Sequence, residues 1–213
     1  MSRLEHLDSD NRRCMLIAIS GGIGSGKSMV CRVLRCMGYD VYDCDSEAKR
    51  LMDASNSIKS AIARDICADV IIGSKIDRKR LAEIVFSDSM MLDRLNTIVH
   101  SEVRSDILSW SANKQIAFVE TAILYQSGLD KLVNEVWEVT APNALRVRRV
   151  MQRNGMSAEE VQCRINAQED FEPESTHSCV KFIENDDLKP LLPRIMDCLN
   201  VLAVCGGNTH ISQ

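Results

Sequence analysis

The chain has 213 residues, with 26 lysines and arginines, 30 aspartates and glutamates and a formal net charge of −4. This length suits one well-buried domain with a small inserted subdomain, and the acidic balance provides no overall basic field, so we expect no nucleic-acid partner. The apolar run over residues 15–19 is too short for a signal peptide or a membrane span, so we expect a cytoplasmic protein without membrane contact, and we expect a monomer.

The first predicted element is a buried strand over residues 15–19 that leads into a glycine-rich loop. The loop, Gly21–Ser28, fits the phosphate-binding pattern G-x-x-x-x-G-K-[ST], and apolar residues recur after it at helical spacing until Gly38. Such a loop turns its backbone N–H groups toward an anion, while the lysine reaches the β- and γ-phosphates of ATP and the serine holds a magnesium ion. A glycine-rich turn without a ligand is the alternative, and the intact Lys-Ser ending argues against it. The residues expected to contact ATP in this segment are Gly22, Ile23, Gly24, Ser25, Gly26, Lys27, Ser28 and Met29.

A short second strand at residues 41–42 ends in two aspartates, Asp43 and Asp45, ahead of a helical pattern. In an open α/β sheet the carboxyl ends of the strands face the ligand crevice, and the phosphate loop lies at the same edge. One aspartate can instead cap the following helix, which still leaves the other for function. We therefore expect at least one of the pair to act at the nucleotide site.

Residues 57–112 are predicted to be helices with no strand between them, and we interpret them as an inserted subdomain that binds a substrate. Asp77 can cap the helix that carries Arg78, and His100 lies in the longest helix of the insertion. Arg78 belongs to a basic run that either meets a phosphate or faces solvent. His100 is either a ligand contact or a packed or surface histidine.

Two further strands are predicted before the next helix. The strand over residues 115–120 ends in Glu120, a carboxylate delivered to the crevice that can hold magnesium through a water molecule. The strand over residues 136–139 stops before Pro142, and Asn143 is the expected cap of the helix that follows.

Residues 143–168 are predicted to form a hairpin of two helices. Ser157 and Glu160 match a capping box at the start of the second helix, and Met156 and Val161 are spaced as a hydrophobic staple. We interpret the hairpin as a lid that closes over the phosphates, the alternative being an exposed basic face. Its arginines are Arg146, Arg148, Arg149, Arg153 and Arg164.

A last strand over residues 180–183, a turn at 185–187 and a closing helix over 188–204 complete the pattern. We predict an α/β fold of the P-loop nucleotide kinase type, with three layers and a mostly parallel sheet. Its expected parts are a core of residues 14–56, 113–142 and 178–204, a helical substrate-binding insertion of residues 57–112, an arginine-bearing lid of residues 143–168 and disordered termini of residues 1–12 and 206–213.

Two features narrow the class of P-loop protein. A signalling GTPase needs N-K-x-D and D-x-x-G motifs, and the nearest approach, residues 113–116, lacks the aspartate. Over about residues 15–190 the chain resembles the dephospho-coenzyme A kinase family. The motifs that carry the resemblance are the Gly21–Ser28 loop, Asp43-Cys44-Asp45, Asp77-Arg78 with Leu81, Val85 and Phe86, Leu95-Asn96 with His100, the Arg149-to-Gly155 segment, Arg164-Ile165 with Gln168, and Ile183-Glu184-Asn185.

The chain departs from the family pattern at three places, one of which is the small residue Cys44 in place of alanine between Asp43 and Asp45, a change expected to be harmless. After the acidic strand end the family usually reads P-L-L-F-E, whereas residues 122–126 contain neither the proline nor the glutamate, since Gln126 stands at the end. Ser101 follows His100 where the family commonly has proline. Gln126 leaves the family glutamate without a counterpart, but this departure does not affect the phosphate loop or Asp45.

The resemblance implies that the γ-phosphoryl group of magnesium-bound ATP is transferred to the ribose 3′-hydroxyl of dephospho-coenzyme A, the last step of coenzyme A biosynthesis. It implies that Asp45 is the general base and binds the acceptor. It also implies that Lys27, Arg149 and Arg153 are catalytic, because they stabilise the charge on the transferring group.

The resemblance and the positions of the motifs imply the remaining site residues. Asn185 is expected to contact ATP, Arg78 and His100 to contact the acceptor, and Ser28 and Glu120 to hold the metal. Two other functions stay open at this point. One is a kinase of the same fold that acts on nucleosides or nucleotides, and the other is a nucleotide-binding module without catalysis.

Overall fold

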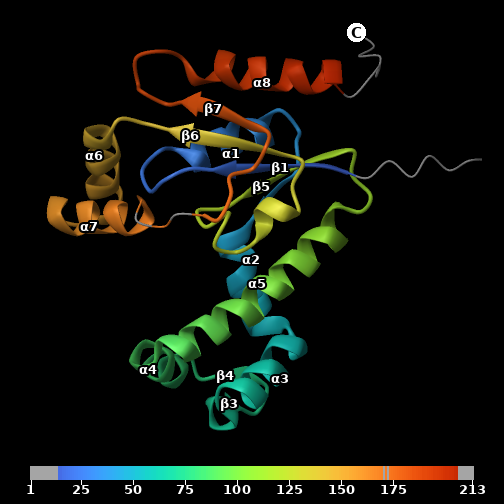
Figure 1. Ribbon diagram of the computed structural model, residues 1–213, viewed down its shortest axis with the longest axis vertical. Helices are drawn as coiled ribbons and strands as arrows, with labels where there is room; N and C mark the ends of the chain where they lie inside the picture. Colours follow the sequence, from blue (N-terminus) through green and yellow to red (C-terminus); the bar gives the residue numbers. More distant parts are fainter. Residues whose placement is uncertain (1–13, 170, 172, 206–213) are drawn as a thin grey trace, which may run out of the picture.

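The computed structural model describes residues 14–169, 171 and 173–205, so the expected disordered termini, residues 1–12 and 206–213, lie outside the described residues. Five strands form one sheet in the order β2-β5-β1-β6-β7, and every neighbouring pair is parallel (Figure 1). The strands are β1 Met15–Ser20, β2 Val41–Asp43, β5 Ile116–Glu120, β6 Glu135–Thr140 and β7 Val180–Glu184.

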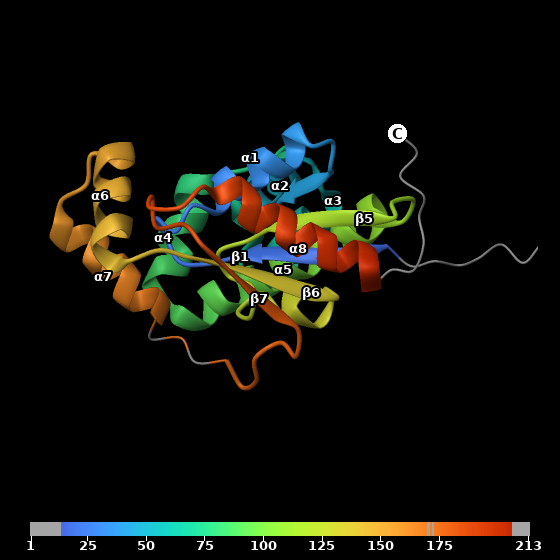
Figure 2. The same cartoon turned by 90° about the horizontal axis from the view of Figure 1, so that it is seen from above.

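Alternate side chains of the central strand β1 enter two separate hydrophobic cores. Leu16 and Ala18 pack on one face with α2 and α5, whereas Ile17 and Ile19 pack on the other face with α1 and α8. Figure 2 shows α1 and α8 together above the sheet. Because both faces are covered, the strands are continuous apolar runs, and the predicted three-layer α/β arrangement is confirmed. The helices of the two outer layers are α1 Lys27–Cys36, α2 Cys44–Ala54, α5 Ser89–Ser111 and α8 Leu191–Cys205.

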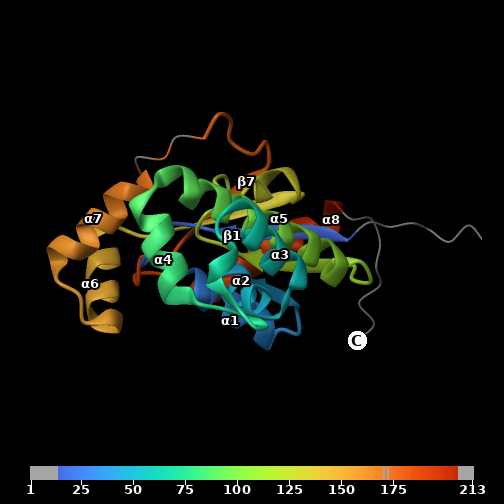
Figure 3. The same cartoon turned by 90° about the horizontal axis from the view of Figure 1, so that it is seen from below.

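Helix α5 extends far beyond the sheet, and α3, Asn56–Asp65, and α4, Arg78–Ser87, pack against it (Figures 1 and 3). Asp77 caps α4 as predicted, because its Oδ1 accepts the N–H of Arg80 at 3.1 Å. The expectation of no strand in this insertion is wrong.

Two short antiparallel strands lie in the insertion, β3 at Ile71–Ile72 and β4 at Lys75–Ile76. They turn around Gly73, whose φ of 61° lies in the left-handed region. Strands of two residues are too short to show alternation in the sequence, which is why the pattern did not reveal them. A 3-10 turn, Ala68–Val70, precedes them, and a second one, Leu129–Lys131, lies between β5 and β6.

The predicted lid is a hairpin of α6, Asn143–Asn154, and α7, Ala158–Glu169. The capping box is confirmed, since the N–H of Ser157 donates to Glu160 Oε2 at 2.8 Å and the N–H of Glu160 donates to Ser157 Oγ at 3.2 Å. The cap predicted at Asn143 is wrong, because this residue lies inside the first turn and Pro142 precedes it without a side-chain bond. Asn143 Nδ2 instead donates to Gln162 Oε1 at 3.0 Å and joins the two helices.

The closing helix begins later than predicted, at Leu191 rather than residue 188. The Oδ1 atom of Asp186 accepts the N–H groups of Leu188 and Lys189 at 3.1 and 3.3 Å and forms a turn there. Pro190 also disfavours helical backbone at the residue before it, so the helix starts after the proline. Among the helices that the structure describes, none is both long and apolar enough to cross a membrane.

Candidate active site

The phosphate loop joins β1 to α1, and its backbone approaches other segments closely. Gly24 has a φ of 78° and Gly26 a φ of 105°, both in the left-handed region. A Cβ atom at Gly26 would lie 2.0 Å from Nδ2 of Asn185, and one at Gly24 would lie 2.6 Å from the carbonyl oxygen of Arg146. Only glycine fits these two positions without strain. The loop thereby presents the N-terminus of α1 as an anion site.

Lys27 is held within the loop, where its Nζ donates to the carbonyl oxygens of Gly21 at 2.6 Å and Gly22 at 3.2 Å. Burial lowers the pKa of Lys27, and the nearby carboxylates, of which Glu120 has the largest effect, act in the opposite direction. The lysine is therefore a largely buried cation whose acceptors are neutral carbonyls. A phosphate oxygen is a stronger acceptor than these carbonyls for the same N–H groups.

The Oγ atom of Ser28 donates to Oε1 of Glu120 at 2.7 Å. Glu120 ends β5 and is paired in register with Ile19 of β1 and with Asp43 of β2, so three strands end at this point. Hydroxyl and carboxylate oxygens are the ligands that Mg²⁺ prefers. These residues therefore fit the magnesium site expected from the sequence.

The two aspartates after β2 have different surroundings. Asp43 is the N-cap of α2, because its Oδ1 accepts the N–H groups of Asp45 and Ser46, each at 3.1 Å, and its Oδ2 accepts from Ser46 Oγ at 2.9 Å. Asp45 lies in the first turn of α2 and lines the cavity beside the phosphate loop. Asp43 is therefore the helix cap of this pair, and Asp45 is the candidate for a chemical role.

A cavity of about 480 Å³ brings together the phosphate loop, the strand ends and the lid. Its position at the carboxyl ends of parallel strands is the usual place for a ligand in an open α/β sheet. The predicted site residues that line it are Ile23, Gly24, Gly26, Lys27, Ser28, Met29, Asp45, Glu120, Arg149 and Arg153. Most of the residues predicted for the candidate site therefore lie around one cavity.

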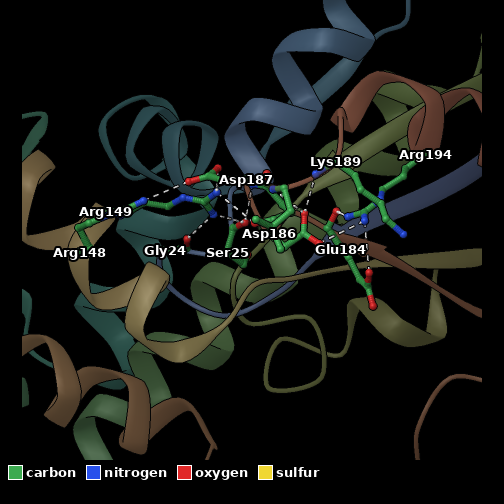
Figure 4. A network of polar contacts seen from close by, with 11 residues as sticks. Gly24, Ser25, Arg148, Arg149, Glu184, Asp186, Asp187, Lys189 and Arg194 are labelled. Atoms are coloured by element: carbon green, nitrogen blue, oxygen red, sulfur yellow. Dashed lines mark hydrogen bonds and ion pairs between the residues drawn. The ribbon is translucent and has the colours of Figure 1, made fainter.

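The guanidinium of Arg149 contacts carbonyl oxygens of the phosphate loop (Figure 4). Its Nη1 donates to the carbonyl oxygens of Gly24 at 3.3 Å and Ser25 at 3.2 Å. Its Nη2 donates to the carbonyl oxygen of Asn185 at 3.0 Å and to Oδ1 of Asp187. These four acceptors match the four terminal N–H groups of the side chain. Asn185 contacts the same loop through its own Nδ2, which donates to the Ser25 carbonyl at 2.8 Å.

Arg153 lies one turn further along α6 and also lines the cavity. Its side chain makes a bond with a neighbour in the sequence, from Nε to Oδ1 of Asn154 at 2.8 Å. Its terminal nitrogens have no hydrogen-bond acceptor among the residues that the structure describes. The two lid arginines therefore have different surroundings, although they were predicted with a single role.

Two lid residues that had no predicted function also hold the loop. Arg146 Nε donates to the carbonyl oxygen of Ile23 at 3.0 Å, and Gln168 Oε1 accepts the N–H of the same residue at 2.7 Å. The sequence contained a signal for the contact that Arg146 makes. Arg146, Arg149 and Arg153 are spaced i, i+3 and i+7, and therefore lie on one face of α6.

Arg78 and His100 were expected to contact the substrate that accepts the phosphoryl group. Neither residue lines the cavity of the phosphate loop. Arg78 Nη2 forms an ion pair with Asp53 Oδ1 at 2.8 Å on the surface. His100 lines a separate cavity of about 700 Å³ together with Tyr125 and Gln126. Burial, and to a smaller extent the charge of Arg104, lowers the pKa of His100, which favours the neutral imidazole.

The fold and the site together define a P-loop kinase, in which a phosphate loop, an acidic strand end and an arginine-bearing lid surround one cavity. The family model described as dephospho-CoA kinase matches residues 15–189. The chain belongs to the dephospho-CoA kinase family.

Individual relatives agree with this assignment. A dephospho-CoA kinase from Porphyromonas gingivalis is 41% identical over 155 residues, which cover 72% of this chain and 77% of that protein. The solved structure of a dephospho-CoA kinase from Campylobacter jejuni is 26% identical with a TM-score of 0.58, and the match covers 91% of this chain and 98% of that one. A solved structure from Thermus thermophilus, titled TT1252, is 31% identical with a TM-score of 0.68, covering 92% of this chain and all of that one.

Proposed function

We propose that this protein transfers the γ-phosphoryl group of ATP to the ribose 3′-hydroxyl of dephospho-coenzyme A in the cytoplasm, which gives coenzyme A and completes its biosynthesis. The observation that carries the proposal is the grouping of Asp45, Lys27 and Arg153 around one cavity at the carboxyl edge of the sheet. Family membership supports the choice of acceptor. All of these groups come from one chain, so a monomer suffices for the proposed site.

The phosphate loop binds the triphosphate of ATP through its backbone N–H groups and through Lys27. Ser28 and Glu120 would hold the magnesium ion, one through its hydroxyl and the other through its carboxylate. The ion, when bound, neutralises charge on the β- and γ-phosphates. Ser28 Oγ donates to Glu120 Oε1 at 2.7 Å, so the two oxygen groups lie side by side.

Asp45 is the proposed general base. It takes the proton of the 3′-hydroxyl as that oxygen attacks the γ-phosphorus, and the bond between the γ-phosphorus and the bridging oxygen breaks to release ADP. Asp45 is available for this step because Asp43, and not Asp45, caps α2. Lys27 and Arg153 stabilise the charge on the transferring group and on the leaving oxygen.

The helical insertion is the proposed site of the coenzyme A moiety. His100 contributes through the cavity that it shares with Tyr125 and Gln126. A contact from Arg78 requires that its ion pair with Asp53 open first, because this pair occupies the guanidinium.

The test is an assay of ADP release from magnesium-ATP with and without dephospho-coenzyme A, with the acceptor product followed by mass. The expected result is acceptor-dependent ADP release and the gain of one phosphate on the ribose. If ATP binds but the acceptor gains no phosphate, the acceptor is wrong, and a panel of nucleosides and nucleotides becomes the next assay. Failure of the whole panel would identify a nucleotide-binding module without catalysis.

A further inference from the structure

Asp187 has an unusual backbone conformation. Its φ is 61°, and it is the one residue other than glycine with a positive φ in the part of the chain that the structure describes. The neighbouring Asp186 fixes the turn by accepting the N–H groups of Leu188 and Lys189. A position in the left-handed region favours glycine, and aspartate tolerates it better than most other residues. What aspartate adds over glycine at this position is a carboxylate.

That carboxylate contacts two consecutive arginines of α6 (Figure 4). Oδ1 accepts from Arg149 Nη2, and Oδ2 accepts from Arg148 Nη2 at 3.3 Å. The two contacts differ in exposure, because the Arg148 side chain is 61% exposed and the Arg149 side chain is only 23% exposed. Solvent screens the outer pair more strongly, so the pair with Arg149 is the effective one.

The same guanidinium holds the phosphate loop. Arg149 Nη1 and Asn185 Nδ2 both donate to the carbonyl oxygen of Ser25, at 3.2 and 2.8 Å. In a planar trans peptide the carbonyl and the following N–H point in opposite directions. Two donors on the Ser25 carbonyl therefore keep the N–H of Gly26 pointing away from them, toward the phosphates that the loop is proposed to bind.

We propose that Asp187 is a positioning residue for nucleotide binding, which orients Arg149 so that its guanidinium holds the Gly24 and Ser25 carbonyls of the phosphate loop. This inference rests on the proposed function and assigns different roles to the two lid arginines, Arg149 and Arg153. Arg149 shapes the loop before ATP arrives, and Arg153, which lines the cavity and whose terminal nitrogens have no acceptor within the described residues, contacts the transferring phosphoryl group. Without Asp187, the Arg149 side chain loses its only anionic partner within the described residues.

The test compares Asp187→Gly, which tolerates the positive φ, and Asp187→Asn, which preserves the shape of the side chain, with the wild-type enzyme. Glu184→Gln is the matched control, because it removes another exposed carboxylate at the end of β7, just before the same turn, and this carboxylate pairs with Arg194 at 3.3 Å. The first readout is the dissociation constant of a fluorescent ATP analogue, measured without acceptor. The second is the pair of kcat and KM for ATP in the transfer reaction.

Both Asp187 variants should bind the analogue about tenfold more weakly and raise KM for ATP by a similar factor, while kcat changes by less than about twofold. The control variant should bind like the wild type. In an Arg149→Met background, Asp187→Gly should cause no further loss, because the carboxylate acts through that arginine.

Three results would overturn the inference. Wild-type binding by both Asp187 variants would show that the loop does not need the carboxylate. Additive losses in the Arg149→Met background would show that Asp187 acts by another route, and an equal loss in Glu184→Gln would indicate a general effect of charge on the turn. Because the binding assay contains no acceptor, a chain that fails to phosphorylate dephospho-coenzyme A would refute the proposed function and still test the role of Asp187.

Discussion

Ser28 Oγ and Glu120 Oε1 lie 2.7 Å apart, although 92 positions separate the two residues in the sequence. Ser28 is the second residue of α1, and Glu120 ends the neighbouring strand β5. Parallel strand order brings them together, since β5 is paired directly with β1. A hydroxyl and a carboxylate are the kind of oxygen groups that a divalent cation prefers, and the proposed magnesium site uses both.

This arrangement predicts a change in metal dependence. Glu120→Gln should keep the hydrogen bond from Ser28 and lose the negative charge, so the magnesium concentration for half-maximal activity should rise about tenfold or more. Activity measured over a magnesium titration at saturating ATP tests this. An unchanged magnesium requirement would remove Glu120 from the metal site.

The two aspartates after β2 should respond differently to substitution. Asp45→Asn should leave ATP binding nearly intact and lower kcat by about 10²-fold or more, because the 3′-hydroxyl loses its proton acceptor. Kinetics at saturating substrates, combined with ATP binding by calorimetry, test this. Full activity in Asp45→Asn would exclude the role of general base.

Asp43→Ala should act mainly on stability. It removes the N-cap of α2, whose Oδ1 accepts two backbone N–H groups, and should cost about 1 kcal/mol in the free energy of unfolding. Urea denaturation of this variant beside Asp45→Asn provides the comparison. Equal stability of Asp43→Ala and the wild type would contradict the assignment of the cap.

Lys27→Ala should weaken ATP binding and lower kcat together, since the lysine is expected to contact the β- and γ-phosphates both before and during transfer. Lys189→Ala, which removes a lysine side chain from the turn after β7, is a suitable control. ATP affinity like that of the wild type in Lys27→Ala would contradict the role assigned to the loop lysine.

The acceptor contacts predict a change in one Michaelis constant and not the other. His100→Ala should raise KM for dephospho-coenzyme A by about three- to tenfold and leave KM for ATP unchanged, because His100 lies outside the phosphate-loop cavity. The same measurement on Arg78→Ala tests whether the pair with Asp53 opens during turnover. If both variants keep the wild-type KM for the acceptor, the insertion does not bind it through these residues.

The sequence was sufficient for the parts of this protein that depend on local pattern. Buried parallel strands are apolar runs and the phosphate loop has a fixed spacing, so β1, the loop and α1 could be predicted together. The capping box at Ser157 and the cap at Asp77 followed from adjacent residues in the same way. The fold class followed from the order of these elements.

Long-range contacts could not be predicted from local pattern. The brace formed by Arg149, Asp187 and the Ser25 carbonyl joins three segments, and no spacing rule specifies which arginine of a basic helix meets which carbonyl. The two-residue strands β3 and β4 gave no signal for a related reason. They depend on the turn at Gly73 and on the contact of β4 with α2 more than on their own residues.

The lid has a small hydrophobic core of its own, formed by Val150, Val161 and Ile165, and Ile23 at the tip of the phosphate loop packs against it. This contact is apolar, unlike the arginine and amide bonds that also join the two parts. Salt screens interactions between charges but leaves apolar burial nearly unaffected. The loop and the lid should therefore remain mechanically linked at ionic strengths that weaken the guanidinium contacts, so that occupation of the loop is transmitted to the lid through a side chain that carries no charge.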